Sequence, residues 1–344
     1  MVKYIDNADA AHDAPGGLGI LLTNLGTPDA PTRAAVRRYL AEFLSDPRVV
    51  ELPRLLWWPV LHGIILQLRP GRSAKAYRKI WTPEGSPLLA IAKNQAAAIS
   101  NNLGGRLAGD FRVGLGMRYG NPSIKSVLEE LRAAGVRRLL VFPLYPQYAA
   151  ATTGSAFDAV ADVLKTWRAV PELRMVNYYH DDPGYIGALA GSIQAHQARR
   201  GRADKLLFSF HGLPRYCHEA GDPYYRQCQD TARLVAETLA FKEDEWCVSF
   251  QSRFGPRAWL RPYTSETLTA WAAGGVKNVS VICPGFSSDC LETLEEINIL
   301  NRALFLAAGG EEFNYIPALN DRASHVEFLS DLIIRHCQGW PEIS

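Results

Sequence analysis

The sequence predicts an α/β protein with two domains, each built on a parallel sheet with helices on both faces. Short runs rich in β-branched and aromatic residues alternate with longer stretches of helical periodicity. A chain of 344 residues is too long for one comfortable core and fits two domains. Two parts of the chain also resemble each other, in the same order. Together these observations predict paired domains with a cleft between them.

Eight runs are expected to form strands, four in each half of the chain. Those of the first half are residues 19–24, 112–117, 138–142 and 174–178. Those of the second half are residues 206–210, 247–251, 279–283 and 312–316. Helices are expected between them, for example over residues 124–134, 231–239 and 292–308.

The internal similarity lies in the segments around the expected strands. Residues 112–117 lead into Tyr-Gly-Asn-Pro at 119–122, and residues 206–210 lead into His-Gly-Leu-Pro at 211–214. Farther on, Ala-Ala-Gly at 133–135 and at 272–274 each precede a strand closed by proline. These matches indicate a duplicated α/β unit. Ligands of such units bind at loops on the carboxyl ends of the strands.

Charge and motifs exclude several functions. Lys and Arg total 37 against 35 for Asp and Glu, so no basic field would attract nucleic acid. Gly114-x-Gly116 lies inside an expected strand without a following helix, and no G-x-x-x-x-G-K-[ST] motif occurs. An NAD enzyme or an ATPase is therefore disfavoured.

The cysteines and the N-terminus predict a cytoplasmic protein. None of the six cysteines forms a C-x-x-C pair, which is typical of reduced, mostly buried thiols; a metal cluster or a disulfide set is the alternative. Residues 1–17 are polar and lack an apolar run, so they match neither a secretory signal nor a transit peptide. We expect them to form a disordered or loosely packed lead-in.

Residues 52–68 form an unusually apolar stretch that includes Trp57 and Trp58. The stretch is short for a membrane span and is interrupted by Pro59 and His62, which disfavours a transmembrane helix. It is either a buried helix or an apolar lip that contacts the membrane interface or guards an apolar cleft.

His211 is the first candidate for chemistry. It follows the apolar run 206–210 on a Gly-Leu-Pro turn, where it could simply cap the turn. Its place at the carboxyl end of a strand favours a functional site, since a neutral imidazole there could accept a proton or bind a metal.

The second candidate is an acidic stripe on the helix expected from residue 288 or 289 onward. Asp289, Glu292 and Glu296 have the spacing i, i+3 and i+7, so they share one face of an α-helix. A preference for acidic residues in the first helical turn explains Asp289 and Glu292 but not Glu296. A histidine facing this stripe across an interdomain cleft would make an incomplete metal site, which suits a metal in passage more than structural zinc.

A third element, Phe-Pro-Leu-Tyr-Pro-Gln-Tyr at 142–148 followed by Thr-Thr-Gly-Ser at 152–155, predicts a bent loop with aromatic edges. Such a surface suits a large planar ligand, although plain packing explains it equally well.

With these blocks in view, the sequence resembles the ferrochelatases. The similar segments are Ser-Phe-His-Gly-Leu-Pro at 209–214, Tyr-Pro-Gln-Tyr at 145–148 with Thr-Thr-Gly at 152–154, and 283–294. Residues 22–28 resemble the opening strand and loop. The blocks keep the family's order over roughly residues 18–338.

The resemblance implies two Rossmann-like chelatase domains, an interdomain cleft that holds protoporphyrin IX, and insertion of Fe²⁺ to form haem. The first domain would span 1–172, carry the lip at about 52–68, and be completed by a C-terminal helix at 322–344; the second would span 173–321. The resemblance further implies that His211 and Glu292 form the catalytic and iron site, and that Asp289 and Glu296 continue a path for protons or metal. Seven residues would line or rim the porphyrin pocket: Leu25, Arg69, Tyr77, Ser86, Arg118, Tyr119 and Trp259.

Departures from the family pattern bear on cofactors and location. Eukaryotic members usually carry His at the position of Cys290, so Cys290 is assigned no ligand role. Members with an iron–sulfur cluster have a cysteine where this chain has Ala149, Ala150 and Ala151, and further cysteines near the C-terminus. No cofactor is therefore expected, with Fe²⁺ as a substrate. The lip implies peripheral contact with the inner face of the membrane.

Two alternatives stay open at this point. A related chelatase would act on coproporphyrin or sirohydrochlorin, although the Trp-rich lip favours a more apolar porphyrin. A two-lobed protein that binds haem or metal without chemistry would hold iron firmly and keep haem absorbance after purification.

Overall fold

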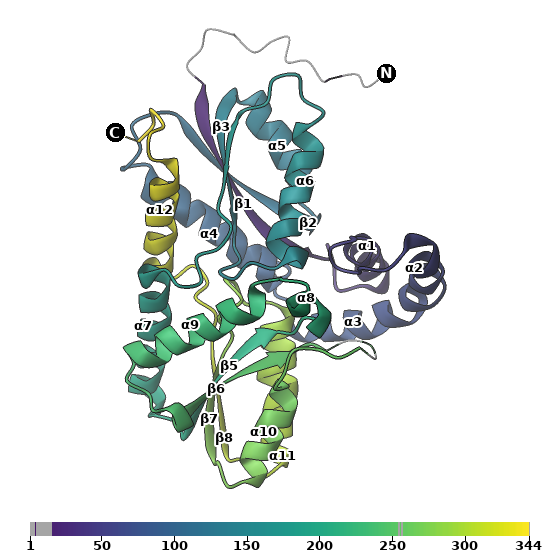
Figure 1. Ribbon diagram of the computed structural model, residues 1–344, viewed down its shortest axis with the longest axis vertical. Helices are drawn as coiled ribbons and strands as arrows, with labels where there is room; N and C mark the ends of the chain where they lie inside the picture. The colour runs from purple at the N-terminus through teal and green to yellow at the C-terminus, as the bar shows by residue number, and fades with distance from the viewer. Residues whose placement is uncertain (1–3, 5–15, 254, 256, 344) are drawn as a thin grey trace. The chain divides into compact units, whose positions relative to one another are not determined.

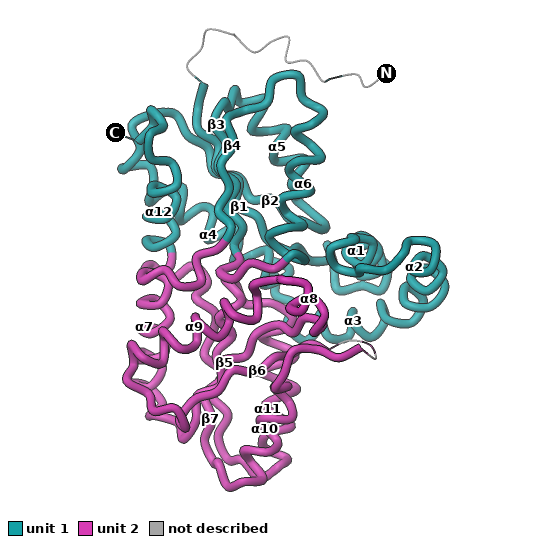
Figure 2. The backbone as a smooth tube through the Cα atoms, viewed as in Figure 1, with its two compact units in different colours: residues 1–144, 150–177, 326–344 teal, residues 145–149, 178–325 magenta. Residues whose placement is uncertain are grey.

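The computed structural model describes residue 4, residues 16–253, residue 255 and residues 257–343. The lead-in expected over residues 1–17 falls almost wholly outside this range. The chain divides into two compact units, coloured separately in Figure 2. Unit 1 comprises residues 1–144, 150–177 and 326–344; unit 2 comprises 145–149 and 178–325.

Unit 1 contains a four-stranded parallel sheet with the order β2-β1-β3-β4. Its strands are β1 (Gly17–Thr27), β2 (Phe111–Gly120), β3 (Val136–Pro143) and β4 (Glu172–Met175). All four strands were expected from the sequence; the first three are longer than expected, and β4 begins and ends earlier. The central strand β1 is almost entirely buried, which explains its continuous apolar run.

Helices cover both faces of this sheet. Figure 1 shows α5 and α6 on one side and α4 and α12 on the other. Their bounds are α4 (Pro87–Leu103), α5 (Ile124–Ala133), α6 (Ser155–Leu164), preceded by a π-helical turn at Ala150–Gly154, and α12 (Ala323–Cys337). The side chain of Ser123 caps α5 by accepting from the amide of Ser126 at 3.1 Å. The core on this side joins apolar residues of β1 and β3 to those of α5 and α6.

Four further helical segments form a group of their own in unit 1. They are α1 (Arg33–Leu44), α2 (Arg54–Val60), the π-helical turn η1 (Leu61–Ile65) and α3 (Leu66–Ile80). Thr32 caps α1, and α1 packs against α3. The expected apolar stretch 52–68 thus falls on α2, η1 and the start of α3.

Unit 2 repeats the arrangement with the order β6-β5-β7-β8, again all parallel. Its strands are β5 (Lys205–His211), β6 (Trp246–Gln251), β7 (Asn278–Ile282) and β8 (Glu312–Ile316). The two sheets share one strand order, which supports a duplicated unit. The match of residues 119–122 with 211–214 was wrong, because β2 occupies the place of β6 and not that of β5. The match of residues 133–135 with 272–274 is confirmed, since they precede β3 and β7, which occupy the same place in the two sheets.

A hydrogen bond shows the true correspondence between the two sheets. The amide of Met117 in β2 donates to the carbonyl of Pro122, and the amide of Phe250 in β6 donates to that of Pro262. The structural counterpart of the His211 segment is therefore the end of β1.

Helices also cover both faces of the second sheet. Figure 1 shows α7 and α9 on one side and α10 and α11 on the other. Their bounds are α7 (Pro183–Arg200), α8 (Arg215–Glu219), α9 (Tyr224–Thr238), the 3₁₀ turn η3 (Glu243–Glu245), α10 (Thr264–Ala273), η4 (Glu292–Asn301) and α11 (Arg302–Ala307). Ile297 of η4 and Phe305 of α11 join the core over β5, β7 and β8.

The helix expected over residues 292–308 differs from the prediction in its form. It begins at Glu292, without a cap from Ser288 or Asp289, and it is a π-helix as far as Asn301. The side-chain amide of Asn301 donates to the carbonyl of Glu296 at 2.8 Å, across the widened turns. Wide turns of this kind occur often at functional sites, and tertiary contacts that periodicity does not reveal set their position.

Candidate functional site

His211 ends the central strand β5 of unit 2 and pairs in register with Gln251 of β6. The next residue must be small: a β-carbon on Gly212 would lie 2.7 Å from the carbonyl oxygen of Gln251 and 3.2 Å from the ring of Trp259. The backbone of residues 258–260 also pairs with that of 213–215. Close packing on the following glycine therefore fixes the position of His211, and it brings Trp259 beside it.

One contact of the imidazole determines its tautomer. The Nδ1 atom of His211 lies 2.7 Å from the carbonyl oxygen of Gly212. A carbonyl oxygen only accepts, so Nδ1 carries the hydrogen and a neutral ring has its lone pair on Nε2. No described residue makes a hydrogen bond to Nε2, and the side chain is half-buried. His211 can thus accept a proton or bind a metal at Nε2.

The amide of Gln251 links this strand end to the π-helix η4. Its Nε2 donates to the carbonyl of Glu292 at 3.0 Å, and its Oε1 accepts from Ser209 at 2.7 Å. Gln251 lies opposite His211 in the sheet, so this bond fixes the first residue of η4 near the imidazole.

The carboxylate of Glu296, farther along η4, is held by Ser252. It accepts from the amide of Ser252 at 2.7 Å and from the Ser252 hydroxyl at 2.5 Å. Ser252 has a φ of 65°, in the left-handed region, and this conformation aims both donors at the same carboxylate. Burial raises the pKa of Glu296, and the nearby charge of Glu292 adds to the rise, while Ser252 and His211 oppose it. Thus His211, Glu292 and Glu296 form one electrostatic group.

Asp289 lies apart from this group in its bonding. Its carboxylate is buried and accepts from the Tyr315 hydroxyl, from Thr293 Oγ1 at 3.0 Å and from Asn320 Nδ2 at 2.8 Å. The three acidic residues expected on one helix face therefore do not form a continuous stripe. Asp289 anchors the segment that precedes η4, and only Glu292 and Glu296 lie on the helix.

A small polar cavity of about 230 Å³ borders Glu296 within unit 2. Gln251, Ser252, Thr264 and Asn301 also line it. Asn301 is 4% exposed, and its Oδ1 makes no hydrogen bond. The cavity therefore offers oxygen atoms suited to water or a cation in transit beside the carboxylate.

The expectation that His211 faces the acidic stripe from the other domain is wrong. His211, Glu292, Glu296 and Trp259 all belong to unit 2. The stripe follows β7, the strand next to β5, and carboxyl ends of neighbouring parallel strands meet at one edge of a sheet.

The other predicted site residues belong to unit 1. Leu25 and Tyr119 lie near the carboxyl ends of β1 and β2, where Gly26 pairs with Tyr119. A β-carbon on Gly26, whose φ is 106°, would lie 1.7 Å from the Tyr119 carbonyl oxygen, so only glycine permits this approach. Ser86 accepts from Thr27 Oγ1 at 2.8 Å, which holds it against the end of β1.

The remaining members of that set lie on α3 and β2. Arg69 and Tyr77 are on α3, where Tyr77 is buried and packs edge-on against Trp81 with ring centroids 6.0 Å apart. Arg118 lies on β2 next to Tyr119.

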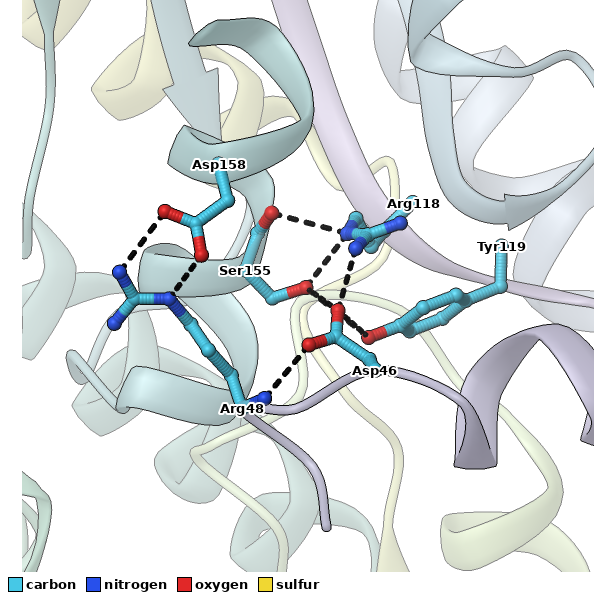
Figure 3. Close-up of polar contacts among 6 residues, drawn as sticks. All are labelled: Asp46, Arg48, Arg118, Tyr119, Ser155 and Asp158. Atoms are coloured by element: carbon cyan, nitrogen blue, oxygen red, sulfur yellow. Dashed lines mark hydrogen bonds and ion pairs between the residues drawn. The ribbon is translucent and has the colours of Figure 1, made fainter. Parts of the chain in front are cut away.

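Sequence reasoning missed the group around Arg118 and Tyr119, which Figure 3 shows. Asp46, in the loop after α1, accepts from Arg118 Nη2 at 2.5 Å, from the Tyr119 hydroxyl at 2.8 Å and from Ser155 Oγ at 2.5 Å. Beside it, Arg48 forms an ion pair with Asp158 of α6. Nothing in the pattern around Asp46 indicates this role, because its partners come from distant parts of the chain.

The apolar stretch at 52–68 is only partly buried. Trp57 is buried and donates from its ring nitrogen to the carbonyl of Leu44 at 2.7 Å. In contrast, Leu55 is 91% exposed, Leu68 72% and Ile64 55%, with Leu56, Trp58 and Val60 also exposed. The interpretation as a buried helix is therefore wrong. No helix among the described residues is both long and apolar enough to span a membrane.

The cysteines are free thiols, four of the six buried. Cys290 lies near Glu292, and burial raises the pKa of its thiol well above the ordinary value, with the charge of Glu292 adding to the rise. Across the residues that the structure describes, no three His, Cys, Asp or Glu side chains are grouped as ligands of one ion.

Comparison with known proteins gives consistent matches. A family model described as Ferrochelatase matches residues 17–337. A protein of Nitrosococcus oceani named Ferrochelatase is 57% identical over 97% of this chain and 91% of its own. One of Thioalkalivibrio sulfidiphilus with the same name is 56% identical over 99% of this chain and 92% of its own.

Among solved structures, SirB from Bacillus subtilis with Fe³⁺ aligns with a TM-score of 0.55 and 12% identity, over 95% of this chain and 100% of that one. The sirohydrochlorin chelatase SirB from Bacillus subtilis subspecies spizizenii in complex with cobalt aligns with a TM-score of 0.53 and 12% identity, over 95% of this chain and 98% of that one. At this identity the likeness concerns the fold alone.

Proposed function

Because the chain belongs to the ferrochelatase family, we propose that His211 accepts the pyrrole protons that leave protoporphyrin IX as ferrous iron enters it. The enzyme is a lyase of haem biosynthesis that inserts Fe²⁺ into protoporphyrin IX. Each turnover forms bonds from iron to the pyrrole nitrogens and releases two protons. A base beside the macrocycle therefore lowers the barrier to metal insertion.

The geometry of His211 supports its role as that base. Its Nδ1–H is committed to the Gly212 carbonyl, so the lone pair of a neutral ring resides on Nε2. This fixed orientation means that no rotation or tautomer change is needed before proton transfer, which is the benefit of a preorganised catalytic group. The same Nε2 could bind Fe²⁺, so His211 is proposed as base and as iron-site residue.

Glu292 is proposed as the second catalytic and iron-site residue, with Glu296 beside it. Both lie on η4, and the charges of Glu292 and His211 both act on Glu296. A carboxylate with a raised pKa can take up a proton and pass it on near neutral pH. The polar cavity next to Glu296 supports a route for protons or hydrated Fe²⁺ along this side. Asp289 is proposed to continue the path, with its carboxylate holding the start of η4.

Porphyrin binding is proposed for residues of both units. In unit 1 these are Leu25, Arg69, Tyr77, Ser86, Arg118 and Tyr119; in unit 2, it is Trp259. Flat aromatic and apolar side chains suit the macrocycle, and the arginines and Ser86 suit its propionate groups. The packing of Trp259 on Gly212, directly after His211, supports its inclusion.

We propose that the enzyme works in the cytoplasm and contacts the inner face of the membrane through the exposed apolar side chains of α2, η1 and α3. Leu55, Leu56, Trp58, Ile64 and Leu68 support this, since Trp and Leu side chains favour the interface. Nucleic acid is not among the proposed partners. An iron–sulfur cluster is not proposed, because residues 149–151 are all alanine.

The relatives named Ferrochelatase do not favour the alternatives. They match at 56–57% identity over nearly the whole chain, whereas the likeness to sirohydrochlorin chelatase concerns fold alone. The observation that carries the proposed mechanism is the Nδ1–H bond of His211 to Gly212, which leaves Nε2 as the reactive nitrogen. Anaerobic mixing of the purified protein with Fe²⁺ and protoporphyrin IX, followed by loss of the free-base porphyrin spectrum, tests the activity. Parallel assays with coproporphyrin and sirohydrochlorin test the substrate.

A further inference from the structure

We propose that Asp46 is a positioning residue, which through one carboxylate oxygen orients Arg118 and Tyr119 for porphyrin binding; this rests on the proposed role of those two residues. Asp46 lies in the loop after α1, and its side chain is 2% exposed. A buried carboxylate is costly unless charge and hydrogen bonds compensate for it. Its partners therefore reveal what it holds in place.

Three donors converge on the Oδ2 atom of Asp46. They are Arg118 Nη2 at 2.5 Å, the Tyr119 hydroxyl at 2.8 Å and Ser155 Oγ at 2.5 Å. The other oxygen, Oδ1, accepts from the amide of Arg48 at 2.7 Å. These bonds outweigh the effect of burial, so the pKa of Asp46 is lowered and the group is ionised at neutral pH.

Ser155 completes the hold on Arg118, as Figure 3 shows. Arg118 Nε lies 3.0 Å from the Ser155 carbonyl oxygen and 2.6 Å from its hydroxyl oxygen. Among the described residues, the hydrogens on Nη1 make no hydrogen bond, and the side chain is 21% exposed. The guanidinium is thus held on one edge and left available on the other. A fork fixed in this way matches a carboxylate, the group that a porphyrin propionate presents.

Tyr119 is held by the same segment. Its ring packs edge-on against Phe43 of α1, with centroids 5.1 Å apart, and the Arg118 guanidinium lies 4.6 Å from its centroid. Glu42 of α1 also accepts from the amide of Gly120 at 2.9 Å. The end of α1 and the loop after it therefore fix both side chains at the carboxyl end of β2. Asp46 is the charged centre of that arrangement.

The test compares Asp46→Asn with Arg118→Ala and with the double variant. Asparagine has one oxygen, so it cannot serve both the three donors and the Arg48 amide. We expect Asp46→Asn to raise the KM for protoporphyrin about tenfold, the order set by a lost hydrogen bond to a charged group, with kcat changed less than about twofold. In the Arg118→Ala background, Asp46→Asn should cost less than it does alone, because only its hold on Tyr119 is left to lose.

Equilibrium titration of protoporphyrin fluorescence, without iron, gives a readout independent of turnover and should show the same weakening. Asp158→Asn is the matched control: it removes the partner of Arg48 in the half-exposed outer pair, and KM and kcat should stay at the wild-type values. If Asp46→Asn does not fold by circular dichroism, Ser155→Ala replaces it. That variant keeps the backbone carbonyl for Arg118 and should raise KM by a smaller factor.

Several outcomes would overturn the inference. If folded Asp46→Asn had a wild-type or lower KM, Asp46 would not orient Arg118. Its carboxylate would then do no more than neutralise the charge of the Arg118 guanidinium. Fully additive losses in the double variant would mean that the two residues act separately. An unchanged KM in Arg118→Ala would instead refute the proposed porphyrin contact of Arg118, which is a different failure.

Discussion

His211 donates its Nδ1 hydrogen to the carbonyl oxygen of Gly212 over 2.7 Å, within the turn that the imidazole itself begins. The bond spans adjacent residues, so the orientation of the ring depends on the local backbone. The backbone in turn depends on Gly212, which has no room for a side chain. The reactive nitrogen is thereby presented by the strand end, and Gln251 and Trp259 act on it through the backbone of the turn that they pack against.

Substitution of His211 by alanine should abolish iron insertion and leave the fold intact, because the half-buried side chain contributes little to the core. Anaerobic turnover of Fe²⁺ and protoporphyrin measures the loss, and circular dichroism measures the fold. Cys290→Ser is the control, since the thiol is buried and protonated, and this variant should retain activity. Near-normal chelation by His211→Ala would end the assignment.

Glu296→Gln should lower kcat and yet preserve or raise stability above about pH 4.5. Burial raises the pKa of Glu296 in the folded protein, so its stabilising contribution is full below the unfolded pKa and is lost as the pH rises through the folded value. A neutral glutamine avoids that loss. Thermal unfolding at pH 4 to 8 alongside the iron-insertion rate measures both effects. A variant that unfolds at lower temperature than wild type at pH 7 would contradict this account of Glu296.

His325 should make the protein sensitive to acid. It is buried, its Nδ1 lies 2.7 Å from the Asn320 carbonyl oxygen, and burial lowers its pKa from 6.5 to about 4. The unfolded chain binds a proton near pH 6.5 and the folded chain does not, so unfolding becomes easier by about 3 kcal/mol between pH 6.5 and 4.

His325→Asn keeps a side-chain N–H group that can donate to the Asn320 carbonyl oxygen, and it removes the titrating imidazole. Urea unfolding at several pH values should therefore show a flatter acid decline for the variant, while His62→Asn, at an exposed position, should behave as wild type. Equal slopes for wild type and His325→Asn would disprove the assignment.

The exposed leucines of α2 and α3 should govern binding to lipid surfaces. A Leu55→Glu, Leu68→Glu double variant removes two side chains that are 91% and 72% exposed, and each buried leucine contributes about 1.5–3 kcal/mol. Sedimentation with phospholipid vesicles should show at least about tenfold weaker binding. The control is Gln67→Glu, which adds a charge on α3 next to Leu68 without removing apolar surface. This variant should retain more of the affinity for vesicles than the double variant does. Undiminished binding by the double variant would exclude this surface.

Much of the fold followed from sequence because it depends on local periodicity. Most of the eight strands were predicted because parallel strands buried on both faces are continuous apolar runs. The strand β4 is exposed to half-buried, and its bounds were predicted too late in the chain. The sequence also allowed the prediction that His211 lies near Glu292, because His211 ends β5 and Glu292 follows the neighbouring strand β7. The π-helical form of η4 was not, because contacts such as Gln251 to Glu292 set it. Asp46 was missed for a similar reason: Ser155 and Arg118 are 109 and 72 residues away from it in the chain.

The division of the chain has a consequence for biosynthesis. Unit 1 includes residues 326–343, which follow unit 2 in the chain, and Arg138 of β3 donates to the Glu342 carboxylate at 2.9 Å. Trp340 likewise donates to Glu172, the first residue of β4, at 2.6 Å. On the ribosome, all four strands of the first sheet are made before most of unit 2, but α12 and the segment after it, which pack against that sheet, follow only after unit 2 has been translated. The delay is roughly 10–30 s at ordinary elongation rates. A nascent chain stalled before the tail would hold an unfinished first half.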